Sequence, residues 1–192
     1  LPLFLPQAYA LTLATRIAVL VVFVLSYHLL YGQTGLLSLG HALYFGAGAF
    51  CAVHALNAWG THGLPVTLLP LVGGAGGALT AALLGWVNTR RGGLAFAMIS
   101  LGLAELALAL APMLQALFGG EAGITTNRVT GSGLFGVDYA SARQVYALAA
   151  AWMLAAGWAM HAFTRTPLGR LARAVRDNAE RAAFLGCDPR AL

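Results

Sequence analysis

The sequence predicts an all-α fold, a polytopic transmembrane helical bundle of about five spans followed by a cytoplasmic helix. Its 192 residues are 59% hydrophobic and 9% charged, whereas roughly a quarter of the residues in an ordinary soluble domain are charged. The apolar residues gather in runs of about 20, the length that a helix needs to cross a bilayer. Glycine is frequent inside these runs, and small residues let membrane helices pack closely.

The apolar runs follow one another with mostly short connections, so we treat 1–192 as a single transmembrane domain. One connection is longer, the glycine-rich stretch 119–142, and a loop of this length usually carries function or packs on a partner. The predicted spans are 8–31, 41–59, 64–87, 94–118 and 143–163.

The placement of arginine predicts the orientation in the membrane. Six of the eleven basic residues lie in the tail 164–192, and every basic residue is arginine. By the positive-inside rule this tail is cytoplasmic, which puts 119–142 on the outer side. The preceding span, 94–118, crosses the membrane again and places the arginine pair 90–91 in the cytoplasm. The two basic clusters therefore predict the same orientation. Because the charge is concentrated at one end and no basic groove runs along the chain, we predict a lipid membrane and no nucleic acid as partner.

A glycine-interrupted stretch, YGQTGLLSLGHALYFGAGAF, lies between the first two spans. It is either a tight turn or a re-entrant break within the membrane, and for that reason the side of the N-terminus stays open. A break frees backbone groups that can face a bound solute or be satisfied by the hydroxyl groups of Thr34 and Ser38. Broken helices of this kind line substrate pathways in transporters. The interrupting glycines are Gly32, Gly35 and Gly40.

Few chemically active side chains lie inside the apolar runs. Ser38 and His41 are three residues apart, which keeps an intramembrane serine hydrolase as an alternative, although no orienting acid is near in sequence. Glu105 is the one acid within a span; it is either a functional carboxylate on the pathway or a protonated packing contact. The histidines are scattered without ligand spacing, so no metal site is predicted.

The tail carries the sequence TPLGRLARAVRDNAERAAFLG, which has helical signals at both ends. Thr166 can cap, Pro167 suits the first helical position, and Gly186 marks a stop. One face is rich in alanine, which buries little area in lipid but fits a protein groove, so we favour docking to a cytoplasmic partner over a solvated or an interfacial helix. The chain has no P-loop, so no cofactor is predicted and any ATP is bound by partner subunits.

Four ordered motifs resemble the permeases of branched-chain amino-acid ABC importers of the LivM family. They are GQTGLLSLGHALYFGAGAF, GGLAFAMISLGLAEL, GGEAGI and GRLARAVRDNAERAAFLG, and together they cover nearly the whole chain. The resemblance implies a transport permease in the bacterial inner membrane, without enzymatic activity of its own. The implied partners are ABC ATPase subunits, a second homologous permease and a periplasmic substrate-binding protein.

The resemblance also implies roles for individual residues. The segment 164–192 would be the cytoplasmic coupling loop, and the glycine break would lie on the translocation pathway. The expected ATPase-coupling residues are Arg176, Asp177, Glu180, Ala182, Ala183 and Gly186. The expected pathway residues are Gly32, Thr34, Gly35, Ser38, Gly40 and His41, to which the intramembrane carboxylate of Glu105 is added.

Two departures from the family pattern bear on function. The family continues past the coupling loop with further spans, so we expect a partial chain that cannot transport alone. Gln33 stands where the family usually has an aromatic residue, which leaves the choice of solute open. A permease for urea or short amides is the nearest alternative within transport, and a structural membrane scaffold is another.

Overall fold

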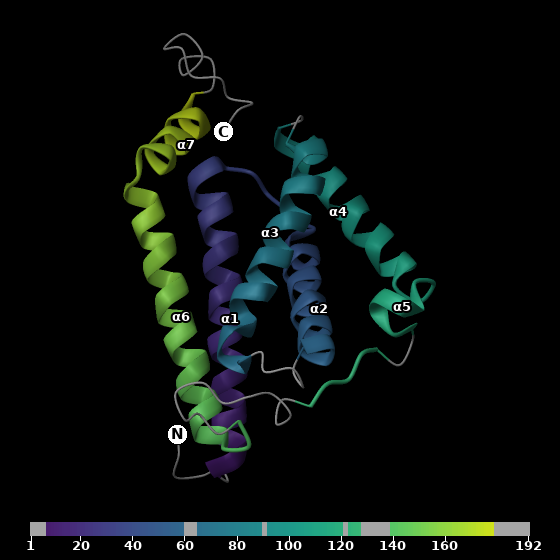
Figure 1. Cartoon of the computed structure of the whole chain (residues 1–192). Coiled ribbons are helices and arrows are strands. Elements are labelled where there is room, and N and C mark those ends of the chain that lie inside the picture. The colour runs from purple at the N-terminus through teal and green to yellow at the C-terminus, as the bar shows by residue number, and fades with distance from the viewer. Residues whose placement is uncertain (1–6, 60–64, 90–91, 121–122, 128–138, 179–192) are drawn as a thin grey trace.

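The computed structural model describes residues 7–59, 65–89, 92–120, 123–127 and 139–178, and the regular structure of these ranges is helical (Figure 1). The all-α prediction is therefore confirmed. The longer helices are α1 (Gln7–Thr34), α2 (His41–Trp59), α3 (Leu69–Asn88), α4 (Gly93–Leu110) and α6 (Ala142–Arg165). The shorter ones are the 3-10 helix η2 (Val66–Leu68), α5 (Gln115–Phe118) and α7 (Pro167–Asp177).

Within the described ranges, four helical segments are long and apolar enough to cross a membrane. They are Tyr9–Thr34, Val66–Asn88, Gly93–Leu110 and Ala142–Arg165. The chain is thus a multi-pass membrane protein. The fifth predicted run, 41–59, forms α2 with those bounds but is not among the four.

The predicted span 94–118 needs correction, because its helix ends early. α4 ends at Leu110, and the amides of Met113 and Leu114 both donate to the carbonyl oxygen of Leu110 in a turn. Pro112 has no N–H to continue the helical ladder, and its ring clashes with the carbonyl one turn earlier. The short α5 follows and lies against α2, where the rings of Phe50 and Phe118 are 4.9 Å apart.

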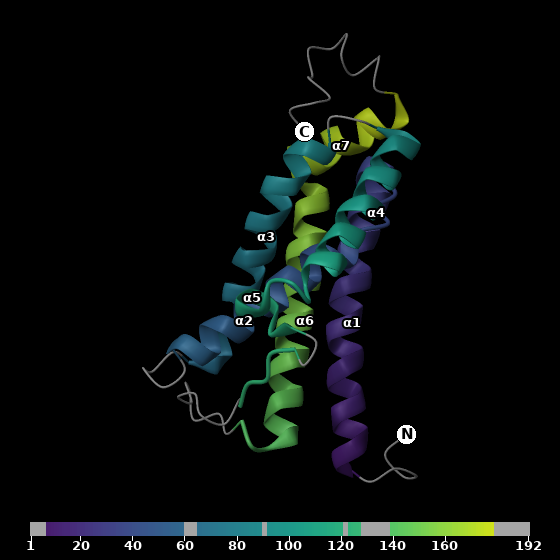
Figure 2. The ribbon, with the colours of Figure 1, turned by 90° about the vertical axis from the view of Figure 1, so that its right-hand side faces the viewer.

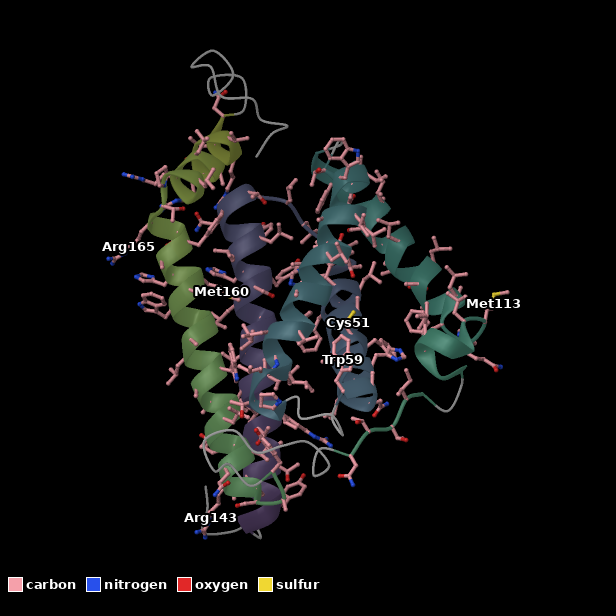
Figure 3. All side chains as sticks on the ribbon, viewed as in Figure 1. Cys51, Trp59, Met113, Arg143, Met160 and Arg165 are labelled. Atoms are coloured by element: carbon pink, nitrogen blue, oxygen red, sulfur yellow. The ribbon has the colours of Figure 1, made fainter. Side chains whose placement is uncertain are left out.

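The helices alternate in direction, and their ends define two sides. In Figures 1 and 2 the end of α3, the start of α4 and all of α7 lie at one end of the bundle, and the start of α1 and the start of α6 lie at the other. The two ends of α6 are marked by Arg143 and Arg165 (Figure 3). At 1.5 Å per residue they are about 33 Å apart, which is close to the thickness of the hydrocarbon core. The N-terminal end of α1, left open by the sequence, is on the side away from α7.

α2 and α3 form the closest helix pair, and glycine makes it possible. A Cβ atom on Gly48 would lie 2.6 Å from the carbonyl oxygen of Gly73, and one on Gly73 would lie 3.0 Å from that of Gly48. The two backbones therefore touch without side chains between them. This confirms the prediction that small residues mediate close packing, and it fixes the position of the segment that precedes α2.

Candidate functional site

The glycine break begins where α1 ends. Gly35 has a positive φ of 71°, a conformation that favours glycine and ends helices, and its amide donates to the carbonyl oxygen of Tyr31 at 2.9 Å. The Thr34 hydroxyl donates to the carbonyl oxygen of Leu30 at 2.7 Å and accepts from the Leu36 amide at 3.3 Å. Thr34 therefore satisfies one freed backbone group, the Leu36 amide, as predicted, whereas the Ser38 hydroxyl, which was expected to do the same, has no hydrogen bond to the described residues.

Beyond Gly35 the chain turns back into the bundle instead of staying at its end. Figures 1 and 2 show that α2 begins below the upper ends of α1 and α3. The Leu39 amide donates to the hydroxyl of Ser100 on α4 at 3.0 Å, and a Cβ atom on Gly40 would overlap the Ser100 carbonyl oxygen. Non-helical backbone at membrane depth is tolerated where protein surrounds it. The helix is thus broken inside the bundle, between the antiparallel helices α1 and α2, and α4 covers the break (Figure 1).

His41, the first residue of α2, lies among aromatic rings. Its ring centroid is 5.3 Å from that of Phe23, 5.6 Å from Tyr27 and 6.4 Å from Tyr44. The Ser26 hydroxyl donates to the Phe23 carbonyl oxygen at 2.8 Å and also lies 2.8 Å from Nε2 of His41. A hydroxyl has only one hydrogen to donate; when Ser26 donates it to Phe23, His41 donates from Nε2 and its Nδ1 is an acceptor.

Several buried polar atoms around the break have no hydrogen-bond partner among the residues that the structure describes. Asn88, at the end of α3, is 0% exposed; its amide interacts with the neighbouring Tyr44 hydroxyl, but neither amide atom makes a hydrogen bond of standard geometry to the described residues. The large majority of buried side-chain polar atoms in proteins are paired, so an unpaired atom needs an explanation. The unpaired atoms are Gln33 Oε1, Ser38 Oγ, His41 Nδ1, Asn88 Oδ1 and Asn88 Nδ2. They give this region an unused capacity to bind a polar ligand.

The arrangement removes the basis for the hydrolase alternative at Ser38. The Ser38 hydroxyl is buried and unpaired, and the Nε2 atom of His41 is directed at Ser26 instead. A serine nucleophile needs a base within hydrogen-bond distance. The Ser38 and His41 pair that this alternative requires does not form.

Glu105 is not brought to the break. The residue before it, Ala104, faces Gly40, whereas Glu105 is exposed on α4. Successive residues of a helix point about 100° apart, so the face of α4 that carries Glu105 is different from the face that covers the break. A role for this carboxylate on the pathway stays a prediction.

The predicted helix of the tail is present but shorter than expected. The Thr166 hydroxyl accepts from the Gly169 amide at 3.2 Å, and Pro167 occupies the first turn, so the predicted cap is confirmed. The helix ends at Asp177, because Asn178 is extended with φ −160° and ψ 98°. A continuous helix to Gly186 was therefore a wrong prediction. Asparagine disfavours helix, because its side chain can hydrogen-bond to nearby backbone groups in non-helical conformations. Glu180, Ala182, Ala183 and Gly186 lie outside the described residues.

The arginines of α7 contact their own chain. Nη1 of Arg176 donates to the carbonyl oxygen of Gly32 near the end of α1, and a Cβ atom on Gly35 would lie 3.0 Å from Cγ of Arg176. Nη2 of Arg173 donates to the Thr164 carbonyl oxygen at 2.9 Å. Arg176 was expected to face the ATPase, so its contact with α1 adds a role that sequence reasoning missed. Asp177 is exposed at the end of the helix.

Comparison with known proteins agrees with the resemblance of the motifs. A family model described as a branched-chain amino acid transport system / permease component matches residues 9–192. No curated protein and no solved structure gives a significant match to the chain.

Proposed function

Because the chain belongs to the family of branched-chain amino acid transport permease components, we propose that it is the permease subunit of an ABC importer in a bacterial inner membrane and that its solute passes the glycine break. The observation that carries the proposal is the set of buried, unpaired polar atoms there, which includes Nδ1 of His41 and both amide atoms of Asn88. Helix interruptions that expose polar groups at membrane depth are typical of solute sites in transporters.

The chemistry of the break fits an amino acid with an apolar side chain. An ammonium group has three donors for acceptors such as His41 Nδ1, and a carboxylate accepts from donors such as the Ser38 hydroxyl and Asn88 Nδ2. The rings of Phe23 and Tyr27 stand beside His41, and such rings offer apolar area to an aliphatic chain. Urea and short amides would use the polar atoms but leave this aromatic surface without a partner.

The energy for transport would come from partner subunits. ABC ATPase subunits would dock on the cytoplasmic side, at α7 and the segment after it, and their closure on ATP would drive alternating access. A second homologous permease would complete the pore, and a periplasmic binding protein would deliver solute on the side away from α7.

Reconstituted uptake tests this proposal. The full-length permease is assembled with its ATPases, second permease and binding protein in liposomes, and ATP-driven uptake is measured for leucine, isoleucine, valine, urea and acetamide. We expect uptake of the amino acids and not of the amides. Uptake of amides alone would correct the solute, whereas solute that neither enters nor stimulates ATP hydrolysis would favour a scaffold. Fluorophosphonate labelling that is lost in Ser38→Ala would favour the hydrolase.

A further inference from the structure

The contact between α7 and α1 joins two parts of the proposed transporter that are far apart in sequence. Arg176 on α7 and Gly32 on α1 are separated by 144 positions. α7 is the element closest to the proposed ATPase site, and α1 leads directly into the break that carries Ser38 and His41. A contact between them can pass a movement from one to the other.

The hydrogen bond to Gly32 exists because α1 is broken. In a continuous helix the Gly32 carbonyl oxygen would accept from the Leu36 amide, four residues later. Here Gly35 has a positive φ, and the Leu36 amide donates to the Thr34 hydroxyl instead. The Gly32 carbonyl is therefore one of the orphan acceptors at a helix C-terminus, and Arg176 supplies its donor.

Charge and packing both favour the contact of Arg176 with the end of α1. The C-terminal end of a helix carries partial negative charge, which favours a nearby guanidinium group. The aliphatic part of Arg176 also packs over Gly35, where a larger residue would both strain the backbone and push the arginine away. The broken form of α1 and the docked position of Arg176 therefore stabilise each other.

α7 has a defined point about which it can move. It is joined to α6 through Thr166, which is extended with φ −69° and ψ 161°. Gly169 is buried on α7, and a Cβ atom there would lie 2.5 Å from the Phe163 carbonyl oxygen of α6. The start of α7 is thus packed on α6, and its far end is fastened to α1 by Arg176.

We propose that Arg176 is a positioning residue that couples α7 to the solute site: its contact with Gly32 and Gly35 stabilises the broken form of α1, and displacement of α7 releases that form. This inference rests on the proposed function, since it assigns the movement of α7 to the ATPase subunits. It differs from a role in ATPase docking because the side chain acts on α1 of its own chain.

The experiment follows the break directly with a thiol reporter. Leu37 lies within the break and is 41% exposed, so Leu37→Cys is introduced after Cys51 and Cys187 are replaced by alanine. The labelling rate by a maleimide is measured in the complete reconstituted complex, without nucleotide and after trapping with ATP and vanadate. ATP hydrolysis and uptake are measured on the same samples.

We expect the reporter to change its labelling rate between the two states in the Leu37→Cys complex. Arg176→Ala should give nearly the same rate in both states and lower the uptake per ATP by about tenfold, while ATP hydrolysis continues. Arg176→Lys should recover part of the response, because it keeps the charge without the planar fork. Arg170→Ala removes an exposed arginine of the same helix and should behave like the unmodified complex.

Two results would overturn the proposal. One is a labelling rate of Leu37→Cys that is the same with and without nucleotide in the unmodified complex. The other is a nucleotide-dependent change in labelling rate that is equal in Arg176→Ala and Arg170→Ala. If Arg176→Ala prevents assembly, Gly35→Ala tests the contact from the α1 side, and an unchanged reporter response in that variant would also overturn it. A complex that responds to nucleotide but takes up no solute would instead contradict the proposed function and leave the coupling intact.

Discussion

The α2–α3 pair and the α1–α7 junction hold the two sides of the glycine break by different means. α2 and α3 meet backbone to backbone at Gly48 and Gly73, with no side chain between the two backbones at that point. α7 packs on α1 over a smaller surface, where one hydrogen bond joins Arg176 to the Gly32 carbonyl group. Close-packed surfaces tolerate little displacement, whereas a single exposed hydrogen bond contributes only about 1 kcal/mol. The difference indicates that α2 and α3 form a rigid support on one side of the break, whereas α7 can move on the other side.

The largest effect should come from breaking the rigid side. Gly48→Leu places a side chain against the Gly73 carbonyl oxygen, so the helices must separate, and overpacking of this kind costs about 1–3 kcal/mol or more. We expect loss of monodisperse protein in detergent, measured by size-exclusion chromatography and thermal unfolding. Gly74→Leu is the matched control, because a Cβ atom at Gly74 has nothing within 4 Å. Equal behaviour of the two variants would show that the pair is not close-packed.

A second change separates function from stability at the break itself. Asn88→Leu keeps the branched shape of the side chain and removes two polar atoms that have no standard hydrogen bond to the described residues, so the free energy of unfolding should rise by up to about 1 kcal/mol. Leucine uptake should nevertheless fall about tenfold or more, because a ligand-binding amide is lost. Thermal unfolding and liposome uptake check the two parts. Asn57→Leu alters an exposed asparagine of α2 and should leave uptake unchanged; a stability loss without a transport defect in Asn88→Leu would make Asn88 a structural residue.

A smaller effect is expected from removing the hydrogen bond by which α4 holds the glycine break. Ser100→Ala removes the acceptor of the Leu39 amide, and loss of such a hydrogen bond costs about 1 kcal/mol. Hydrogen exchange at the Leu39 amide should become faster, while the amides of the α2–α3 pair keep their protection. Ser141→Ala, at the start of α6 and away from the break, is the control. Unchanged exchange at Leu39 would mean that α4 does not hold the glycine break.

The smallest effect concerns the attachment of α7. Thr166→Ala removes the side chain that accepts from the Gly169 amide, and loss of such a cap costs about 1 kcal/mol. Because the effect is local, we expect faster hydrogen exchange within 167–177 and little change in global unfolding. Thr125→Ala, an exposed threonine outside the helices, serves for comparison. Faster exchange throughout the bundle would contradict the separation of movable and rigid parts.

The sequence predicted the helices well, because membrane spans depend on local composition. The bounds of α2 were found to the residue, since glycine and turn formers flank an apolar run. The early end of α4 was missed because hydropathy does not register the backbone donor that Pro112 lacks. The end of α7 at Asp177 was missed for a related reason, since the alanine periodicity continues past a residue whose backbone is extended.

The site was predicted only in part. Thr34, Gly35, Gly40 and His41 lie at the break, as the glycine pattern indicated. Asn88 and Ser100 were overlooked, because a single polar residue in an apolar run has no periodicity to mark it. A polar residue followed closely by the arginine pair was the available signal for Asn88. Contacts between distant segments, such as that of Arg176 with α1, depend on the tertiary fold.

The central claim is that solute binds at the glycine break, and leucine uptake by His41→Ala tests it most directly. His41 offers a buried, unpaired Nδ1 among aromatic rings, whereas His161 on α6 is exposed, so His161→Ala controls for loss of an imidazole. The reconstituted complexes are compared for uptake as a function of the concentration of leucine-loaded binding protein, with assembly and basal ATP hydrolysis confirmed in each. We expect uptake by His41→Ala to fall at least about tenfold and uptake by His161→Ala to match the unmodified complex. Equal uptake by both variants would contradict a solute site at the break.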